Sequence, residues 1–114
     1  NTLFNYTTAH SKALNKVLWD SGHFGKATDI KARIIPIEAF LVGVDDDEQV
    51  NSFVYAHLKI MSGRDMSIRN QLAEQVSATI EQTLGAEQSG RTSLQVCVEV
   101  EEISAVYHKK MLNI

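Results

Sequence analysis

The sequence holds few of the residues that mark specialised classes of protein. Its 114 residues include one cysteine, Cys97, and one proline, Pro36. A lone cysteine cannot form a disulfide within the chain, which fits a reducing compartment, and we expect the cytoplasm. The apolar runs, at residues 34–37 and 40–42, fall far short of the ~18 residues that a membrane span needs. We therefore expect no membrane partner.

An excess of basic residues is also missing. Eleven Lys and Arg residues stand against 14 Asp and Glu residues, which gives a formal net charge of −3. Nucleic-acid binding needs a basic field, so neither DNA nor RNA is an expected partner. The chain is 44% hydrophobic and 22% charged, as in ordinary globular proteins, and its length suits one domain over residues 1–114.

Two helices are predicted by apolar residues at helical spacing. The first runs from about 8 to 21, with Thr8 as a candidate N-cap and Gly22 as its stop. The second begins after Asp65, another candidate N-cap, and ends at Gly85. The apolar residues that define these helices are Leu14, Val17 and Leu18 in the first and Leu72, Val76, Ile80 and Leu84 in the second.

Three strands are predicted between and after these helices. Residues 52–61 and 94–101 alternate between two sets of side chains, as half-buried strands do. Residues 30–42 are rich in β-branched side chains and also favour a strand. Pro36 interrupts this third segment, because proline cannot donate a hydrogen bond to a sheet.

The order helix, strand, strand, helix, strand indicates two copies of a strand-helix-strand unit that lack the first strand. Thr8 and Asp65 lie 57 positions apart, as equivalent caps of a repeat would. We expect an α+β fold with a four-stranded sheet, two helices on one face, and its first strand before Asn1. The other sheet face should be covered by partner subunits, because it would present Phe53, Tyr55 and Met61.

Residue spacing gives little support for a metal or a catalytic triad. The four histidines show no paired ligand spacing, and the acidic run 45–48 lacks the pattern of a calcium loop. His57 has no suitably spaced nucleophile and acid, which favours a packed or interface histidine. Glu99 and Glu101 share a strand face, which more often meets solvent or a neighbouring subunit than forms a catalytic pair.

Several stretches together resemble the 5-carboxymethyl-2-hydroxymuconate isomerase family of the tautomerase superfamily. They are residues 21–24 (SGHF), 55–60 (YAHLKI), Gly63-Arg64 at the start of a helix, and 94–103, which includes EVEEI. The resemblance implies a repeated β-α-β fold assembled as a homotrimer, with isomerase activity in the breakdown of aromatic compounds. It also implies catalysis without a cofactor or metal.

The resemblance further implies a catalytic proline at the N-terminus, acting as a general base through its secondary amine. Asn1 does not match it, and Pro36 cannot replace it because its nitrogen is part of a peptide bond. We therefore expect a proline-led strand ahead of Asn1 and no catalytic base within residues 1–114. The alternative is a truncated or diverged chain without this activity.

Three basic residues are the candidate substrate-binding residues. By the resemblance, Arg64 matches an arginine in the turn before the second helix, where it could hold a substrate carboxylate. Lys31 and Arg33 match basic residues of the second strand; they are two positions apart and so would share one sheet face. A small anionic substrate would suit such a patch. The competing interpretations are solvated side chains or, for Arg64, a trimer salt bridge.

The preferred hypothesis is an isomerase that moves a proton on a small unsaturated dicarboxylate or keto acid. A non-catalytic trimeric binding or scaffold protein with the same fold is the main alternative. A dimeric, ferredoxin-like regulatory domain would also fit the α+β pattern.

Overall fold

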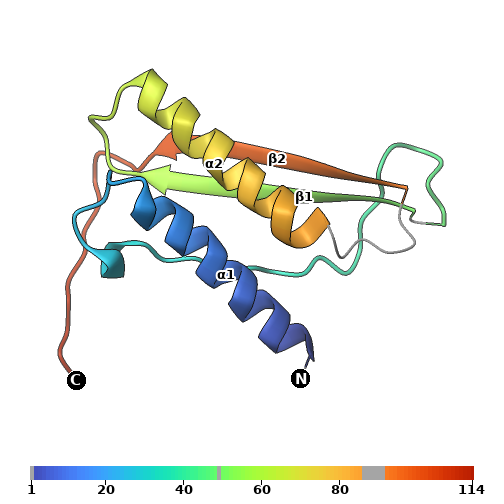
Figure 1. Cartoon of the computed structure of the whole chain (residues 1–114), viewed down its shortest axis with the longest axis horizontal. Coiled ribbons are helices and arrows are strands. Elements are labelled where there is room, and N and C mark those ends of the chain that lie inside the picture. Colours follow the sequence, from blue (N-terminus) through green and yellow to red (C-terminus); the bar gives the residue numbers. More distant parts are fainter. Residues whose placement is uncertain (1, 49, 86–91) are drawn as a thin grey trace.

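The computed structural model describes residues 2–48, 50–85 and 92–114. The element order is α1 (Thr2–Asp20), a short 3-10 helix η1 (Ala27–Asp29), β1 (Asn51–Ile60), α2 (Met66–Leu84) and β2 (Ser93–Glu102). Figure 1 shows the two helices lying across the paired strands, with a long connection between η1 and β1. The α+β class predicted from the sequence is confirmed.

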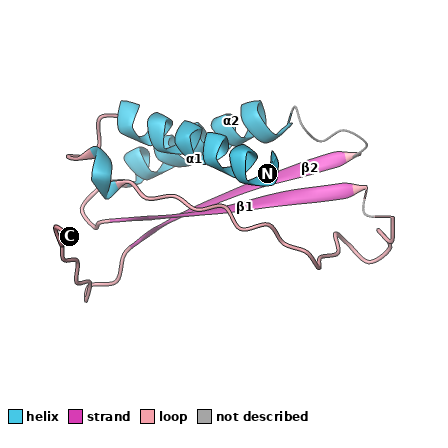
Figure 2. Ribbon diagram, turned by 90° about the horizontal axis from the view of Figure 1, so that it is seen from below, coloured by secondary structure: helices cyan, strands magenta, loops and turns pink. Residues whose placement is uncertain are grey.

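The sheet is a parallel pair joined by α2. Asn51 lies opposite Ser93 and Ile60 opposite Glu102, so β1 and β2 pair along their whole length. A parallel pair needs a crossover connection, and a helix is the usual one. Figure 2 shows α1 and α2 on the same side of the strands, as predicted. Among the described residues, no helix covers the opposite side.

Residues that alternate along β1 form the core with both helices. The buried apolar side chains come from α1, the end of β1 and α2: Leu18, Ile60, Leu72, Val76 and Ile80. Other β1 residues of the same face, Val54, Ala56 and Leu58, pack against this cluster. The 3.6-residue period of α2 and the two-residue period of β1 therefore meet in one apolar layer.

The start of α2 is fixed by the turn that follows β1. The Asp65 side chain accepts a hydrogen bond from the Ile68 amide at 3.0 Å, which confirms Asp65 as the N-cap. Gly63 in the same turn has φ +112°, a conformation that side chains with a Cβ rarely adopt. The cap and the glycine together set the position of Arg64 between them.

The prediction of Thr8 as the cap of the first helix is wrong. Helix α1 begins at Thr2, so Thr8 lies inside it. Polar residues such as Thr cost well under about 1 kcal/mol inside a helix, so a candidate cap does not prevent the helix from starting earlier. The 57-position spacing therefore does not relate two caps.

The prediction of a strand over residues 30–42 is also wrong. This segment runs from η1 toward β1 without sheet pairing, and the described sheet has two of the four expected strands. It approaches β1 through side chains instead: the rings of Phe40 and Phe53 meet edge to face, with centroids 5.9 Å apart. Pro36 has no amide hydrogen to donate, and the described sheet pairs β1 with β2 alone, so the segment runs beside β1 without joining it. The strand expected before Asn1 lies outside the described residues.

Neither described helix is long and apolar enough to cross a membrane.

Candidate functional site

Arg64 connects three segments at one end of the sheet. Its Nη1 donates a hydrogen bond to the Met61 carbonyl oxygen at 3.2 Å. Its Nη2 donates to the carbonyl oxygen of His23, 41 positions away, at 2.6 Å. The guanidinium carbon also lies 5.0 Å from the centre of the Phe24 ring, within range of a cation-π interaction. A half-buried arginine thus ties the end of β1 to the segment after α1.

The segment that receives Arg64 is shaped by the C-terminus of α1. The amides of Ser21 and Gly22 donate to the carbonyl oxygens of Leu18 and Trp19, each at 3.2 Å. Gly22 has φ +80°, the left-handed conformation that commonly ends a helix. This sharp turn carries the His23 carbonyl toward the end of β1.

A cavity of about 480 Å³ opens beside Arg64. Phe24 and Ile60 contribute apolar walls, and four cationic side chains and one carboxylate also line it: Lys31, Lys59, Arg64, Lys109 and Asp29. These residues come from the segments around η1, from β1, from the turn before α2 and from the tail after β2. The cavity is therefore locally cationic in a chain with a net charge of −3. Such a site favours anions.

Sequence reasoning identified Lys31 and Arg64 but missed Lys59 and Lys109. Lys59 has the alternation of an ordinary strand residue, and Lys109 lies in a polar tail without a regular pattern. No local signal relates either lysine to Arg64, because the cavity is formed by segments that meet only in the folded chain.

Lys109 forms an ion pair with Asp29 across 80 positions of sequence. The hydrogen bond from Lys109 holds the pKa of Asp29 below its usual value, and nearby Lys26 and Lys31 act in the same direction. The same bond raises the pKa of Lys109. Both groups therefore stay charged through the neutral range, and the tail is held against η1.

Arg33 lies apart from these residues. It lines a second, mostly apolar groove of about 370 Å³ between residues 33–40 and β1, together with Pro36 and Tyr55. The shared face predicted for Lys31 and Arg33 depended on a strand that does not form, so the two side chains line different cavities. Pro36 is likewise not among the residues lining the cavity beside Arg64.

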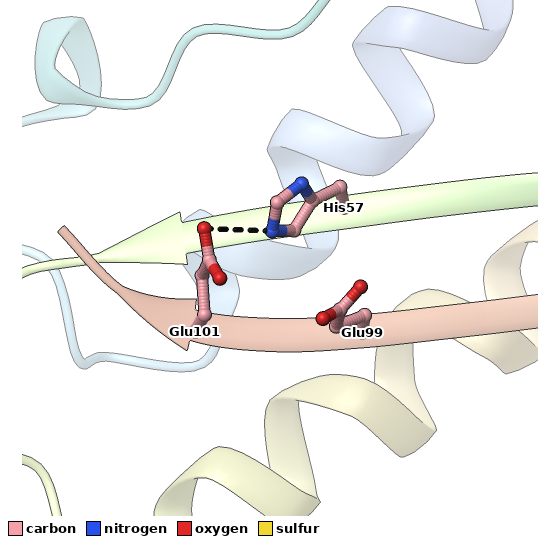
Figure 3. Close-up of side chains that lie close together, drawn as sticks. All are labelled: His57, Glu99 and Glu101. Carbon is pink, nitrogen blue, oxygen red and sulfur yellow. Dashed lines mark ion pairs between the residues drawn. The ribbon is translucent and has the colours of Figure 1, made fainter.

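The open face of the sheet carries a cluster of ionisable side chains. His57 Nε2 lies 3.1 Å from an oxygen of Glu101, and Lys59 Nζ lies 3.5 Å from the same oxygen. Tyr55 donates a hydrogen bond to Glu99, and this bond raises the pKa of the tyrosine. Figure 3 shows His57 on β1 and both glutamates on β2 projecting from this face.

This cluster contains the residues best placed to hold a metal ion in the described part of the chain. One ligand atom from each of His57, Glu99 and Glu101 lies within 4.8 Å of the others. An imidazole and two carboxylates suit zinc or a similar divalent ion. The glutamate oxygens, however, already pair with His57, Lys59 and Tyr55, so a metal would have to come between His57 and Glu101 and displace Lys59 and Tyr55. The arrangement is accounted for by cross-strand pairing.

The fold and the cavity together define a small α+β protein in which a parallel strand pair, backed by two helices, ends at a cation-lined cavity. The family model for 5-carboxymethyl-2-hydroxymuconate isomerase matches residues 7–114. The chain therefore belongs to this family, which confirms the resemblance seen in the sequence and supports an isomerase.

A solved structure has the same fold. It is the crystal structure of a 5-carboxymethyl-2-hydroxymuconate isomerase from Deinococcus radiodurans R1, with a TM-score of 0.78 and 23% sequence identity. The match covers 91% of this chain and 78% of that one. The search of curated proteins gave no match.

Proposed function

We propose that this protein is a cofactor-independent isomerase that moves a proton on a small unsaturated dicarboxylate or keto acid. The family description names 5-carboxymethyl-2-hydroxymuconate, an unsaturated polycarboxylate of this kind. The observation that carries the proposal is the cavity that Arg64, Lys31 and Phe24 line together, with the Arg64 guanidinium over the Phe24 ring. We further propose that the protein acts in the breakdown of aromatic compounds, in the cytoplasm, and as a homotrimer.

In this proposal Arg64 and Lys31 bind the substrate and stabilise its charge. The two hydrogen bonds to Met61 and His23 fix the guanidinium plane and use two of its five N–H groups. The remaining groups can meet a substrate carboxylate. Removing a proton from the carbon chain produces a dienolate, and fixed cations lower the energy of that developing charge.

The base in this proposal is an N-terminal proline ahead of Asn1. Helix α1 has 19 residues and so is about 28 Å long. A preceding strand of about eight residues, at about 3.3 Å per residue, would cover the same distance in the opposite direction. Its first residue would then lie near the C-terminal end of α1, where Arg64 and Lys31 are. A neutral secondary amine at that point could take a proton and return it.

Kinetics of dienol ketonisation test this proposal. The protein is purified from its complete gene, its N-terminus is read from the intact mass, and loss of the dienol absorbance is followed. Charge-assisted hydrogen bonds are worth about 1.5–3 kcal/mol, so Arg64→Met and Lys31→Met should each lower kcat/KM about tenfold to hundredfold. Lys12→Met, at an exposed position of α1, is the matched control and should leave the rate unchanged.

A different result would favour the alternative of a non-catalytic binding or scaffold protein. Pro36 is the sole proline in the 114 residues, and its nitrogen has no free lone pair. If the mature protein has no N-terminal proline and does not accelerate ketonisation, the isomerase proposal is refuted.

A further inference from the structure

We propose that the tail after β2 supplies a second carboxylate subsite, centred on Lys109, which makes the cavity selective for dianions. This inference rests on the proposed function only in placing the substrate in the cavity beside Arg64. It assigns one carboxylate of the ligand to Arg64 and Lys31, and the other to Lys109.

The tail after β2 forms part of the cavity wall. Residues Ile103, Tyr107 and Lys109 line it together with Arg64 and Lys31. The backbone of the tail is anchored at its start, where the Ile103 amide donates to the Ile60 carbonyl oxygen at 2.7 Å. It is anchored again where Lys109 pairs with Asp29. Figure 1 shows the tail leaving β2 and passing η1 before it reaches the C-terminus.

The lysines around Asp29 already interact with its carboxylate. Lys109 donates to Asp29, and the positive charges of Lys26 and Lys31 also act on it. Lys109 is the one that bonds to Asp29 directly, while Lys31 lines the same cavity. An ammonium group has three donors, and its bond to Asp29 uses one, so a ligand carboxylate can bind Lys109 without breaking the pair.

The charge balance of the cavity indicates a ligand with two negative charges. Lys31, Lys59, Arg64 and Lys109 line it against the single carboxylate of Asp29. Lys59 also forms an ion pair with Glu101, at 3.5 Å, so it adds less positive charge to the cavity. Even so, one monoanion would leave the cavity cationic, whereas a dicarboxylate would neutralise most of the remaining charge.

A pair of ligands that differ by one carboxylate provides the test. Muconate and sorbate are six-carbon dienes with two and one carboxylates, and their binding to the full-length protein can be measured by isothermal titration calorimetry. We expect the protein to bind muconate at least tenfold more tightly than sorbate. Lys109→Met should abolish most of that preference while changing sorbate affinity less than twofold.

Two further variants make the result specific. Lys109→Arg keeps the charge and should retain the preference, and Lys110→Met removes a neighbouring exposed charge and should change neither affinity. The subsite is refuted if Lys109→Met weakens both ligands equally, if the preference survives, or if the protein binds neither ligand. Because binding needs no turnover, a Lys109-dependent preference in an inactive protein would support the subsite and refute only the isomerase.

Discussion

At the scale of single residues, Arg64 shows how one side chain can join distant parts of a chain. Its hydrogen bonds reach Met61 and His23, and its guanidinium lies over Phe24. These contacts depend on the planar guanidinium, whose N–H groups point outward within one plane and whose flat face can stack on a ring. The same contacts hold the Arg64 side chain at the edge of the cavity, where the proposed ligand would bind.

We predict that Arg64→Lys lowers the free energy of unfolding by about 1–2 kcal/mol, because lysine keeps the charge but cannot reach two carbonyls at once. Urea unfolding followed by circular dichroism would measure this. Arg33→Lys, at an exposed position, is the control and should change stability by less than about 0.5 kcal/mol. Equal effects of the two substitutions would contradict the structural role of Arg64.

A second residue-scale prediction concerns pH and the cap of α2. The hydrogen bonds from Ser67 and from the Ile68 amide hold the pKa of Asp65 below its usual 3.8. A lowered pKa means that the cap stabilises the fold above about pH 3.8, and that this contribution is lost as the pH falls through the folded-state pKa. Asp65→Ala should therefore lower the melting temperature at pH 7 and have less effect at pH 3.

Asp65→Asn is the matched control, because asparagine keeps a cap oxygen that does not titrate. It should stay close to the original melting temperature at pH 7. A loss of stability in Asp65→Ala that is the same at pH 7 and pH 3 would show that the charge of the cap contributes nothing.

At the scale of elements, β1, α2 and β2 are those whose periodicity is clearest. The predicted limits 52–61 and 94–101 each differ by one residue from the observed Asn51–Ile60 and Ser93–Glu102. One set of side chains in each strand must pack against the helices. This requirement produces an alternation of residue types that is visible in the local sequence. Segment 30–42 differs because its composition suits a strand but strand formation needs a partner backbone.

The packing of α2 gives a prediction at this scale. Leu72 is fully buried between the helices and the sheet, whereas Leu41 is 53% exposed. Leu72→Ala should lower the free energy of unfolding by about 2–5 kcal/mol, because it removes buried methyl groups and leaves a cavity.

Leu41→Ala makes the same chemical change at an exposed position and should cost less than about 0.5 kcal/mol. Chemical unfolding of both variants would measure the difference. Similar costs would mean that α2 does not pack as described.

At the scale of the whole molecule, the two faces of the sheet have different surroundings. One face is covered by α1 and α2, while the other presents exposed Tyr55 beside the pairs formed by His57, Glu99 and Glu101. Among the described residues no helix covers this second, bare face, which leaves it available to further copies of the chain. This is the physical basis for the proposed homotrimer.

We predict that the full-length protein has about three times the mass of its own single chain in size-exclusion chromatography with light scattering. Tyr55→Lys should shift it toward monomers, because it places another cation on the bare face and removes the bond to Glu99. Val44→Lys changes a residue that is 84% exposed in the connection before β1, outside the strands, and the trimer should persist. A monomeric or dimeric parent protein would refute the prediction.

The sequence by itself determined the helices, two strands, the Asp65 cap and the family, because these depend on periodicity and motifs among nearby residues. It also pointed to Arg64 and Lys31, through the resemblance. Only the tertiary structure decided that Lys109, 78 positions after Lys31, lines the same cavity, and that Arg33 lines another. Contacts between such distant positions depend on how the elements pack, and no local pattern of residues specifies that packing.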